Sequence, residues 1–181
     1  YEEASWKGVP YTRFMLLGEI VMRQGRAKEA ELIFRRVLED LEKSLPENHP
    51  ESLRAIGNLA SVLRDQGRFE ESNVMNRRAV EGYEKALGPD HPDTLRVANN
   101  LATVLQYQGK YDESETMCRH VLEGNSRILG TKNPDTLRIT GTLATVLRHQ
   151  GKYDEAEVMS RRALDGYERI LGPDHPDTLR V

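Results

Sequence analysis

The chain has 181 residues, a formal net charge of −3 and a sequence pI near 6.0. This weakly acidic balance disfavours bulk attraction to nucleic acid or to an anionic membrane surface, and no apolar run approaches the ~20 residues that a membrane span needs. A single cysteine, Cys118, excludes an internal disulfide and no Asn-x-Ser/Thr glycosylation acceptor occurs, so we expect a cytoplasmic protein.

Two short patterns recur at a spacing of 42 residues along the whole sequence. One is a dipeptide ending in proline and the other is Gln-Gly; they begin at His49, His91, Asn133 and His175, and at Gln24, Gln66, Gln108 and Gln150. Because two unrelated patterns share one period, the spacing indicates a structural unit repeated in tandem. Such a chain is predicted to form a solenoid, in which each repeat packs only against its neighbours.

The sequence begins with neither an initiating methionine nor a signal peptide, so we expect it to be part of a longer protein. We interpret residues 1–9 as the tail of a preceding repeat, since Tyr1–Ala4 resembles Tyr83–Ala86 near the end of a long predicted helix. The interval from Pro10 to Gly25 is two residues shorter than the equivalent interval in the next two repeats. The first helix is therefore expected to start differently from the others.

Each later repeat opens with a helix that starts at a proline such as Pro92, where the missing N–H costs no helical hydrogen bond. Asp93 then places negative charge in the first turn, where the helix dipole favours it. Apolar residues follow at helical spacing and predict a helix buried on two sides: Leu95, Val97, Ala98, Leu101, Ala102, Val104 and Leu105. Gly109 is predicted to end this helix, because glycine tolerates the positive φ of a helix C-terminus.

A second, longer helix is predicted to begin at Lys110 and to end at Gly130, with acidic residues in its first turn. The pattern predicts one array of helix pairs. Its repeats lie at about residues 10–50, 51–92, 93–134 and 135–176, with the start of a fifth at 177–181.

Gly82, Gly124 and Gly166 interrupt the second helices, at a cost of about 1 kcal/mol each relative to alanine. Two interpretations remain open. The glycines reflect sequence drift in helices that packing stabilises, or they permit a close helix approach or a bend.

The helix pair resembles the tetratricopeptide repeat (TPR), on the evidence of Leu101-Ala102 in the first helix, Gly109-x-Tyr111 at the turn and Ser114 after it. The usual TPR unit has about 34 residues. The longer unit here, with Leu-Gly-x-Asp-His-Pro loops and an Asn-Asn-Leu-Ala helix, resembles the kinesin light chain type. It is also similar to TPR arrays of fungal nucleotide-binding receptor-like proteins. The resemblance implies an all-α, right-handed TPR solenoid of four helix-turn-helix repeats plus partial flanking repeats.

Metal and catalytic sites are disfavoured by the same pattern. His49, His91 and His175 lie in successive loops of a stacked array, which puts them more than ~15 Å apart, so they are interpreted as loop caps. Adjacent carboxylates such as Asp112 and Glu113 point apart on a helix. No Ser/His/Asp arrangement and no phosphate-binding glycine loop occurs, so the sequence predicts no catalytic residue, no metal ligand and no cofactor.

The candidate binding site is the polar face of the first helices, which remains once both apolar sides are packed. Arginines and amides on this face can pair with acidic side chains and with the backbone of an extended peptide. The predicted peptide-binding residues are Arg54, Asn58, Arg96, Asn99, Asn100, Thr103, Tyr107, Arg138, Thr142, Thr145 and His149.

Together these features predict a protein-protein interaction module that binds a peptide or partner segment, of acidic character, in a concave groove. Its parent is expected to be a larger fungal receptor-like or scaffold protein, or alternatively a kinesin light chain-like cargo adaptor. A further alternative is a structural spacer or self-stacking array without a peptide ligand. We expect no enzymatic activity, no nucleic-acid or membrane partner, and end-to-end self-association of the truncated array.

Overall fold

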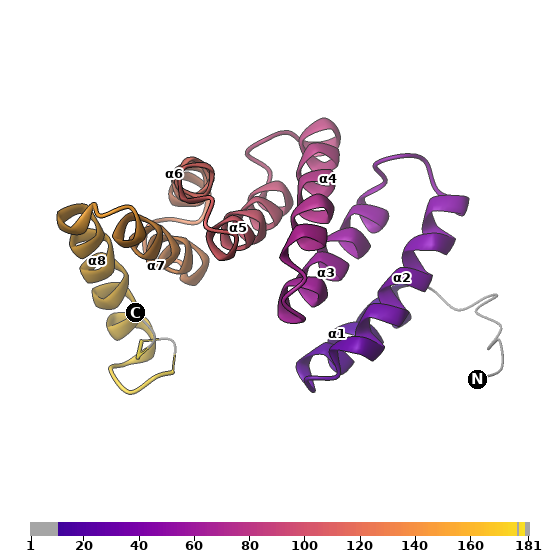
Figure 1. Cartoon of the computed structure of the whole chain (residues 1–181), viewed down its shortest axis with the longest axis horizontal. Coiled ribbons are helices and arrows are strands. Elements are labelled where there is room, and N and C mark those ends of the chain that lie inside the picture. The colour runs from indigo at the N-terminus through magenta and orange to yellow at the C-terminus, as the bar shows by residue number, and fades with distance from the viewer. Residues whose placement is uncertain (1–10, 177, 180–181) are drawn as a thin grey trace. The chain divides into compact units, whose positions relative to one another are not determined.

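A computed structural model describes residues 11–176 and 178–179, and these residues form eight α-helices and no strand (Figure 1). The helices are α1 (Tyr11–Arg23), α2 (Ala27–Ser44), α3 (Pro50–Asp65), α4 (Phe69–Leu87), α5 (Pro92–Tyr107), α6 (Tyr111–Ile128), α7 (Pro134–His149) and α8 (Tyr153–Leu171). They form four consecutive helix pairs, so the predicted all-α repeat array is confirmed. The tail expected at residues 1–9 lies outside the described residues.

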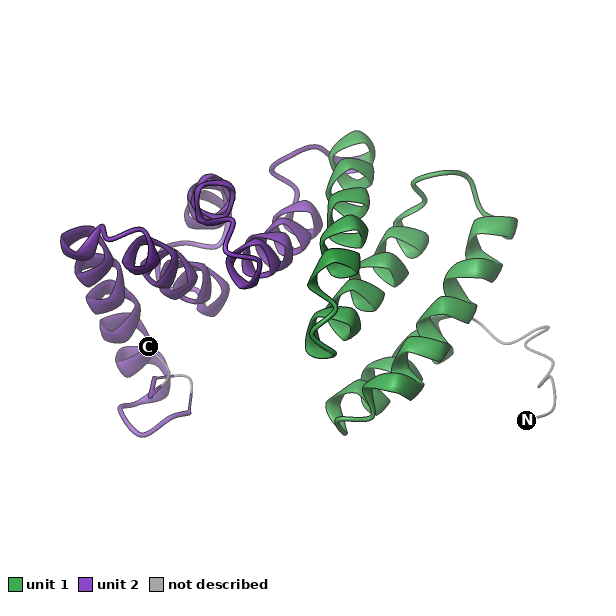
Figure 2. Ribbon diagram, viewed as in Figure 1, with its two compact units in different colours: residues 1–86 green, residues 87–181 purple. Residues whose placement is uncertain are grey.

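The chain divides into two compact units, coloured separately in Figure 2. Unit 1 comprises residues 1–86 and holds α1 to α4, and unit 2 comprises residues 87–181 and holds α5 to α8. In unit 2, α6 packs against both α5 and α7, and α7 packs against α8. Each unit thus contains two full helix pairs with its own buried apolar residues.

Two of the three loop histidines, His49 and His91, cap helices as the sequence predicts. His91 Nδ1 accepts a hydrogen bond from the backbone N–H of Asp93 at 3.2 Å, and His49 Nδ1 accepts one from Glu51 at 3.3 Å. Asn133 does the same with its side-chain oxygen, at 2.9 Å from the Asp135 nitrogen. These bonds satisfy one of the free N–H groups of each first turn. The expectation that the first helix starts differently stays a prediction, because α1 begins at Tyr11, the first of the described residues.

A threonine hydroxyl fixes the loop before each first helix in unit 2. Thr94 donates to the Gly88 carbonyl at 2.8 Å, Thr136 to Gly130 at 2.9 Å and Thr178 to Gly172 at 2.8 Å. The equivalent residue in unit 1 is Ser52, whose Oγ is buried and has no partner in the described part of the chain. The same helix start is therefore satisfied in unit 2 and unsatisfied in unit 1.

This difference gives opposite expectations for two small substitutions. Thr136→Ala should destabilise the chain by about 0.5–1.5 kcal/mol, because it removes a buried hydrogen bond. Ser52→Ala should be neutral or stabilising, because it removes a buried hydroxyl that has no partner. Denaturant midpoints of the two variants provide the comparison, and an equal loss in both would contradict the assignment.

The glycines in the second helices permit close helix contacts, which favours the packing interpretation over sequence drift. A Cβ atom added at Gly124 would lie 2.8 Å from Leu95 Cδ1. Gly82 meets Leu53 and Gly166 meets Leu137 in the same way. Distances below 3 Å are shorter than van der Waals contact, so a side chain at Gly124 would displace Leu95 or α5.

The single cysteine is a packed thiol. Cys118 is fully buried in α6 and forms no disulfide. Burial raises the pKa of its thiol to about 12, since the charged thiolate would lose its hydration. A reactive thiolate is therefore disfavoured at neutral pH.

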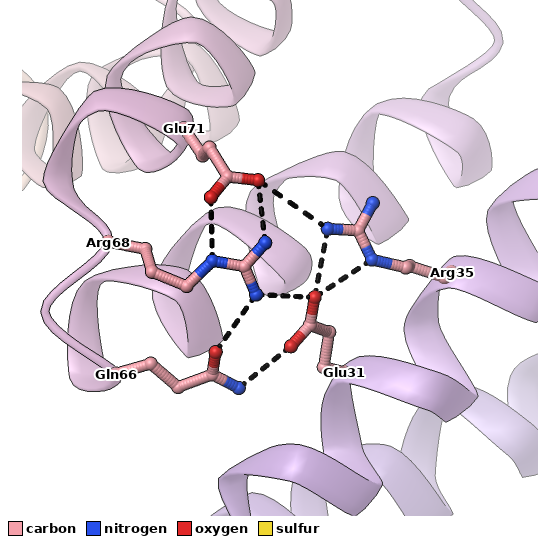
Figure 3. A network of polar contacts seen from close by, with 5 residues as sticks. All are labelled: Glu31, Arg35, Gln66, Arg68 and Glu71. Carbon is pink, nitrogen blue, oxygen red and sulfur yellow. Dashed lines mark hydrogen bonds and ion pairs between the residues drawn. The ribbon is translucent and has the colours of Figure 1, made fainter.

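A network of charged side chains joins neighbouring repeats within each unit. In unit 1, Glu31 of α2 accepts hydrogen bonds from Arg35 at 2.9 Å, from Gln66 at 2.9 Å and from Arg68 at 2.7 Å, and Arg68 also bonds Glu71 at 2.6 Å (Figure 3). In unit 2, the same positions hold Glu115, Arg119, Gln150, Lys152 and Glu155. The network ties the second helix of one repeat to the turn of the next.

Glu115 is the carboxylate at the centre of the unit 2 network. Lys152 Nζ lies 2.7 Å and Arg119 Nη2 lies 2.9 Å from its oxygens. The hydrogen bond from Lys152 is the main cause that lowers the pKa of Glu115 from 4.5 to about 2, with a further contribution from Arg119. The carboxylate is thus stabilised in its charged form by side chains from two elements.

We expect this site to make stability depend on pH in the acid range. Because the folded pKa lies below the unfolded one, the contribution of Glu115 is complete above pH ~4.5 and is lost as the pH falls towards ~2. At pH 7, Glu115→Gln should cost up to about 1 kcal/mol, and the difference from wild type should vanish near pH 2. Thermal unfolding measured across this range tests the expectation. Glu157→Gln is the control, because its ion pair with Arg161 is largely exposed.

Candidate peptide-binding groove

Unit 2 contains a groove of about 700 Å³ that α5, α7 and α8 line together. Five of the predicted residues lie in it: Thr103, Tyr107, Arg138, Thr142 and Thr145. The helices position them there because their apolar stripes face the neighbouring helices, which leaves the polar face over the groove. A smaller cavity of about 210 Å³ on the same two first helices is lined by Arg96, Asn99 and Arg138.

Seven of the predicted residues are thus gathered around two neighbouring cavities, and Arg138 lines both. Two predicted residues of unit 2 are not among them. Asn100 is half-buried and lines neither cavity. His149 stacks its ring on that of Tyr111, with centroids 4.9 Å apart.

The groove arginines have carboxylates beside them. Arg96 Nη2 lies 3.6 Å from Asp93 Oδ1, and Arg138 Nη2 lies 3.2 Å from Asp135 Oδ1. Asn99 is buried, and its amide, oriented with the oxygen towards Arg138, accepts a hydrogen bond from Nη2 at 2.9 Å. Both guanidinium groups remain about half exposed. A ligand carboxylate would therefore compete with an aspartate of the chain itself for each arginine.

The threonines of the groove offer lone pairs rather than protons. The hydroxyl groups of Thr103, Thr142 and Thr145 donate to backbone oxygens four residues earlier, at 3.0, 3.2 and 3.1 Å. Their oxygen atoms can then accept from the N–H groups of a bound chain. The groove thus combines acceptors along α5 and α7 with the donors of Arg138.

Two predicted residues, Arg54 and Asn58, belong to unit 1. Asn58 Nδ2 donates to Glu19 Oε1 of α1 at 3.2 Å. Arg54 is half-buried, and its Nε is buried without a partner in the described residues. The sequence signalled neither the Glu19 contact nor the burial, because both depend on which side chains the neighbouring helix supplies.

The sequence analysis missed the contribution of the second helix to the groove. Ser160, Tyr167 and Leu171 of α8 line it, and so does His175 in the next loop. Tyr167 also donates its hydroxyl to the Pro134 carbonyl at 3.3 Å, which ties α8 to the start of α7. The polar face of the first helices alone could not identify these residues.

Metal sites and membrane-spanning helices are both absent from residues 11–176 and 178–179. In this part of the chain, no group of three or more His, Cys, Asp or Glu side chains is arranged to hold a metal ion. Within the same range, no helix is long and apolar enough to cross a membrane.

Comparison with known structures identifies similar repeat proteins. A Podospora anserina protein described as a kinesin light chain with nearly identical TPR-like repeats superposes with a TM-score of 0.80 at 22% identity, over 93% of this chain and 80% of that one. BtubC (BKLC) of P. vanneervenii gives 0.76 at 19%, over 87% and 62%. The apo form of RapI gives 0.79 at 14%, over 93% and 61%. At these identities the similarity establishes the fold.

Family models agree with the structural comparison. No curated protein is significantly similar to the chain in sequence. Tetratricopeptide repeat models match residues 13–51 and 52–93, and further models of the same description match residues 93–168 and 137–181. Together they span all four helix pairs. The chain belongs to the tetratricopeptide repeat family.

Proposed function

We propose that the chain is a protein-interaction module that holds an extended segment of a partner protein in the groove of unit 2. The observation that carries the proposal is the convergence of seven polar residues from α5 and α7 around two neighbouring cavities that share Arg138. TPR arrays are generally protein-interaction modules, which supports a protein ligand. The same family consists typically of non-enzymatic scaffolds, and we propose no catalytic activity and a cytoplasmic setting for this chain.

The ligand is proposed to carry an acidic side chain opposite Arg138. Asp135 and Asp93 offset the charge of Arg138 and Arg96, so a long acidic run would be repelled as well as attracted. A single carboxylate can replace Asp135 on Arg138, while its neighbouring backbone N–H groups donate to Thr142 and Thr145. We therefore propose an extended peptide with one or two separated acidic residues.

Charge reversal of the arginines tests this assignment. Replacing Arg96 and Arg138 together with glutamate should weaken a bound acidic peptide by about 2–4 kcal/mol, since hydrogen bonds to charged groups contribute about 1.5–3 kcal/mol each and these two are half exposed. Helicity should be unchanged. Binding to a library of acidic peptides, measured by fluorescence anisotropy, gives the affinity.

Arg148→Glu is the matched control, because this arginine is exposed on α7 and lines neither cavity. Unchanged affinity in the double variant would refute the groove. A complete absence of peptide binding would favour the alternative of a structural spacer.

Two parent proteins fit the module. The Podospora anserina neighbour described as a kinesin light chain favours a kinesin light chain-like adaptor as one context. A larger fungal receptor-like or scaffold protein is the other. Sequencing the coding region beside the segment distinguishes them, since heptad repeats would indicate the adaptor and a phosphate-binding loop the receptor.

The expected self-association stays a prediction. Ile170 and Leu171 of α8 are 40% and 38% exposed, compared with 44% and 41% for Ile128 and Leu129 of α6. The apolar surface at these positions is thus no larger on α8 than on a helix that another helix already covers. Sedimentation of the chain over a range of concentrations measures any association.

A further inference from the structure

A second cleft in unit 2 gathers positive charge. It has a volume of about 460 Å³ and lies between α8 and the loop that precedes α7. Four cationic side chains line it, Lys132, Arg161, Arg162 and Arg169, against a single carboxylate, Asp165. We call this the basic cleft. Such a concentration of one sign is unusual in a chain whose net charge is −3.

Three of these cations have no side-chain partner among the described residues. Over residues 11–176 and 178–179, no side-chain hydrogen bond or ion pair involves Lys132, Arg162 or Arg169. Only Arg161 is paired, with Glu157 one turn earlier on α8. Arg162 is also half-buried, so its charge is partly removed from water without a compensating carboxylate.

The preceding repeat neutralises the position equivalent to Arg169. Arg127 pairs with Asp90 at 2.8 Å, and 42 residues later these positions hold Arg169 and Lys132. Lys132 stands where the preceding repeat has Asp90, so the two side chains at these positions repel each other instead of attracting. The chain itself therefore supplies no partner for Arg169 at this position.

A second ion pair is lost in the same way. In unit 1, Arg78 pairs with Glu42 across two helices. The positions 84 residues later hold Arg162 and Ser126, and serine carries no charge. Positions 132 and 126 therefore both lack the carboxylate that an earlier repeat has. As a result, Arg169 and Arg162 are left without an ion-pair partner from these positions, and both line the basic cleft.

The basic cleft lies on a face of the second helix that stays exposed when another helix packs against it. On α6, which is covered by α7, the equivalent positions are occupied by Arg119, His120, Glu123 and Arg127, and all four are exposed. A helix packed against α8 in the same manner would therefore leave the basic cleft open to solvent.

The floor of the cleft is apolar. Leu137 lines it beside Gly166, and Val158 and Ile170 flank it at 59% and 40% exposure. A purely ionic ligand would leave this surface in contact with water. A segment that carries both carboxylates and apolar side chains would cover both kinds of surface.

We propose that the basic cleft docks an acidic, partly apolar segment of a partner protein. Charge complementarity supplies the argument: three unpaired cations and an apolar floor match glutamate or aspartate residues spaced by leucine-like residues. The overall negative charge of the chain disfavours nucleic acid as the ligand. The cleft lies outside the groove of the proposed function, so either site can exist without the other.

The experiment uses a fluorescein-labelled synthetic peptide of Glu-Glu-Leu repeats and its Gln-Gln-Leu counterpart. The glutamate peptide should bind and should bind less tightly as salt is raised, while the glutamine peptide should not bind. Lys132→Asp recreates the pair that Asp90 makes with Arg127, and should weaken the glutamate peptide at least tenfold. Ser126→Glu, at the position equivalent to Glu42, should recreate the pair with Arg162 and should also weaken it.

Arg148→Glu is the matched control, because it changes the net charge by the same amount on an exposed face of α7 that lines neither the groove nor the basic cleft, and it should leave this binding unchanged. Lys132→Asp should also keep or raise the unfolding midpoint, which excludes misfolding as the cause of any loss. Equal binding of the two peptides would overturn the proposal, as would equal losses in Lys132→Asp and Arg148→Glu. Tighter binding of heparin than of the peptide would overturn the assignment to a protein segment.

Discussion

Replacing Gly124 with leucine is expected to destabilise the chain by about 1–3 kcal/mol, although leucine is a better helix former than glycine. The added Cβ would lie 2.8 and 2.9 Å from the two methyl carbons of Leu95, so α5 and α6 would have to separate or Leu95 would have to leave its position. The denaturant midpoint should therefore fall. This sign is opposite to the one that helix propensity alone predicts.

Gly141 of α7 is the matched control for this experiment. It is also a helical glycine in unit 2, but an added Cβ would have no neighbour within 4 Å. Gly141→Leu should therefore stabilise by up to about 1 kcal/mol through helix propensity. A rise in midpoint for both variants would show that the contact between Gly124 and Leu95 yields without cost.

Replacing Phe34 with cysteine is expected to destabilise the chain by about 3 kcal/mol, since truncating a buried aromatic residue leaves a cavity. Phe34 is fully buried, and its ring fills the space beside Gly18, where an added Cβ would lie 2.6 Å from Cε1. The third repeat holds Cys118 and Ala102 at these two positions. The first repeat thus pairs the large Phe34 with Gly18, and the third repeat pairs the smaller Cys118 with Ala102.

The exchange of both residues tests this pairing. Gly18→Ala alone should be destabilising by about 1–3 kcal/mol because the methyl group collides with Phe34. In the double variant the alanine methyl occupies part of the cavity, so the combined loss should be smaller than the sum by about 1 kcal/mol or more. The unfolding free energies of the wild type, the two single variants and the double variant form a double-mutant cycle that measures this coupling. Additive losses would contradict direct packing between the two positions.

Several features of the fold could be predicted from the sequence because they depend on neighbouring residues in the chain. The helix that starts at Pro92 is capped by His91, one residue before it, and ends at Gly109, whose φ is +72°. These signals act over one or two turns, so one sequence suffices to recognise them. The 42-residue period then extends the same assignment to every repeat.

The sequence identified the polar face of the first helices as the candidate site, but it could not determine how each polar residue is used. Helical periodicity put Arg138 and Asn99 on one polar face, and both line the cavities of unit 2. It did not indicate that the two side chains bond one another, or that Asp135 lies 3.2 Å from the guanidinium. A long side chain such as arginine can bond any acceptor within its reach, and these acceptors lie on several turns and on different helices.

The basic cleft shows most clearly what the sequence determined and what the tertiary structure decided. The repeat alignment alone reveals that Lys132 replaces Asp90 and that Ser126 replaces Glu42. Only the tertiary structure shows that Asp90 and Glu42 are ion-pair partners, and that the cations left unpaired line one cleft. Local sequence determines which residues a helix presents, because helical geometry is set over a few residues. Pairing and clefts are decided by the packing of different helices, because the groups that meet there are ~40 residues apart in the chain.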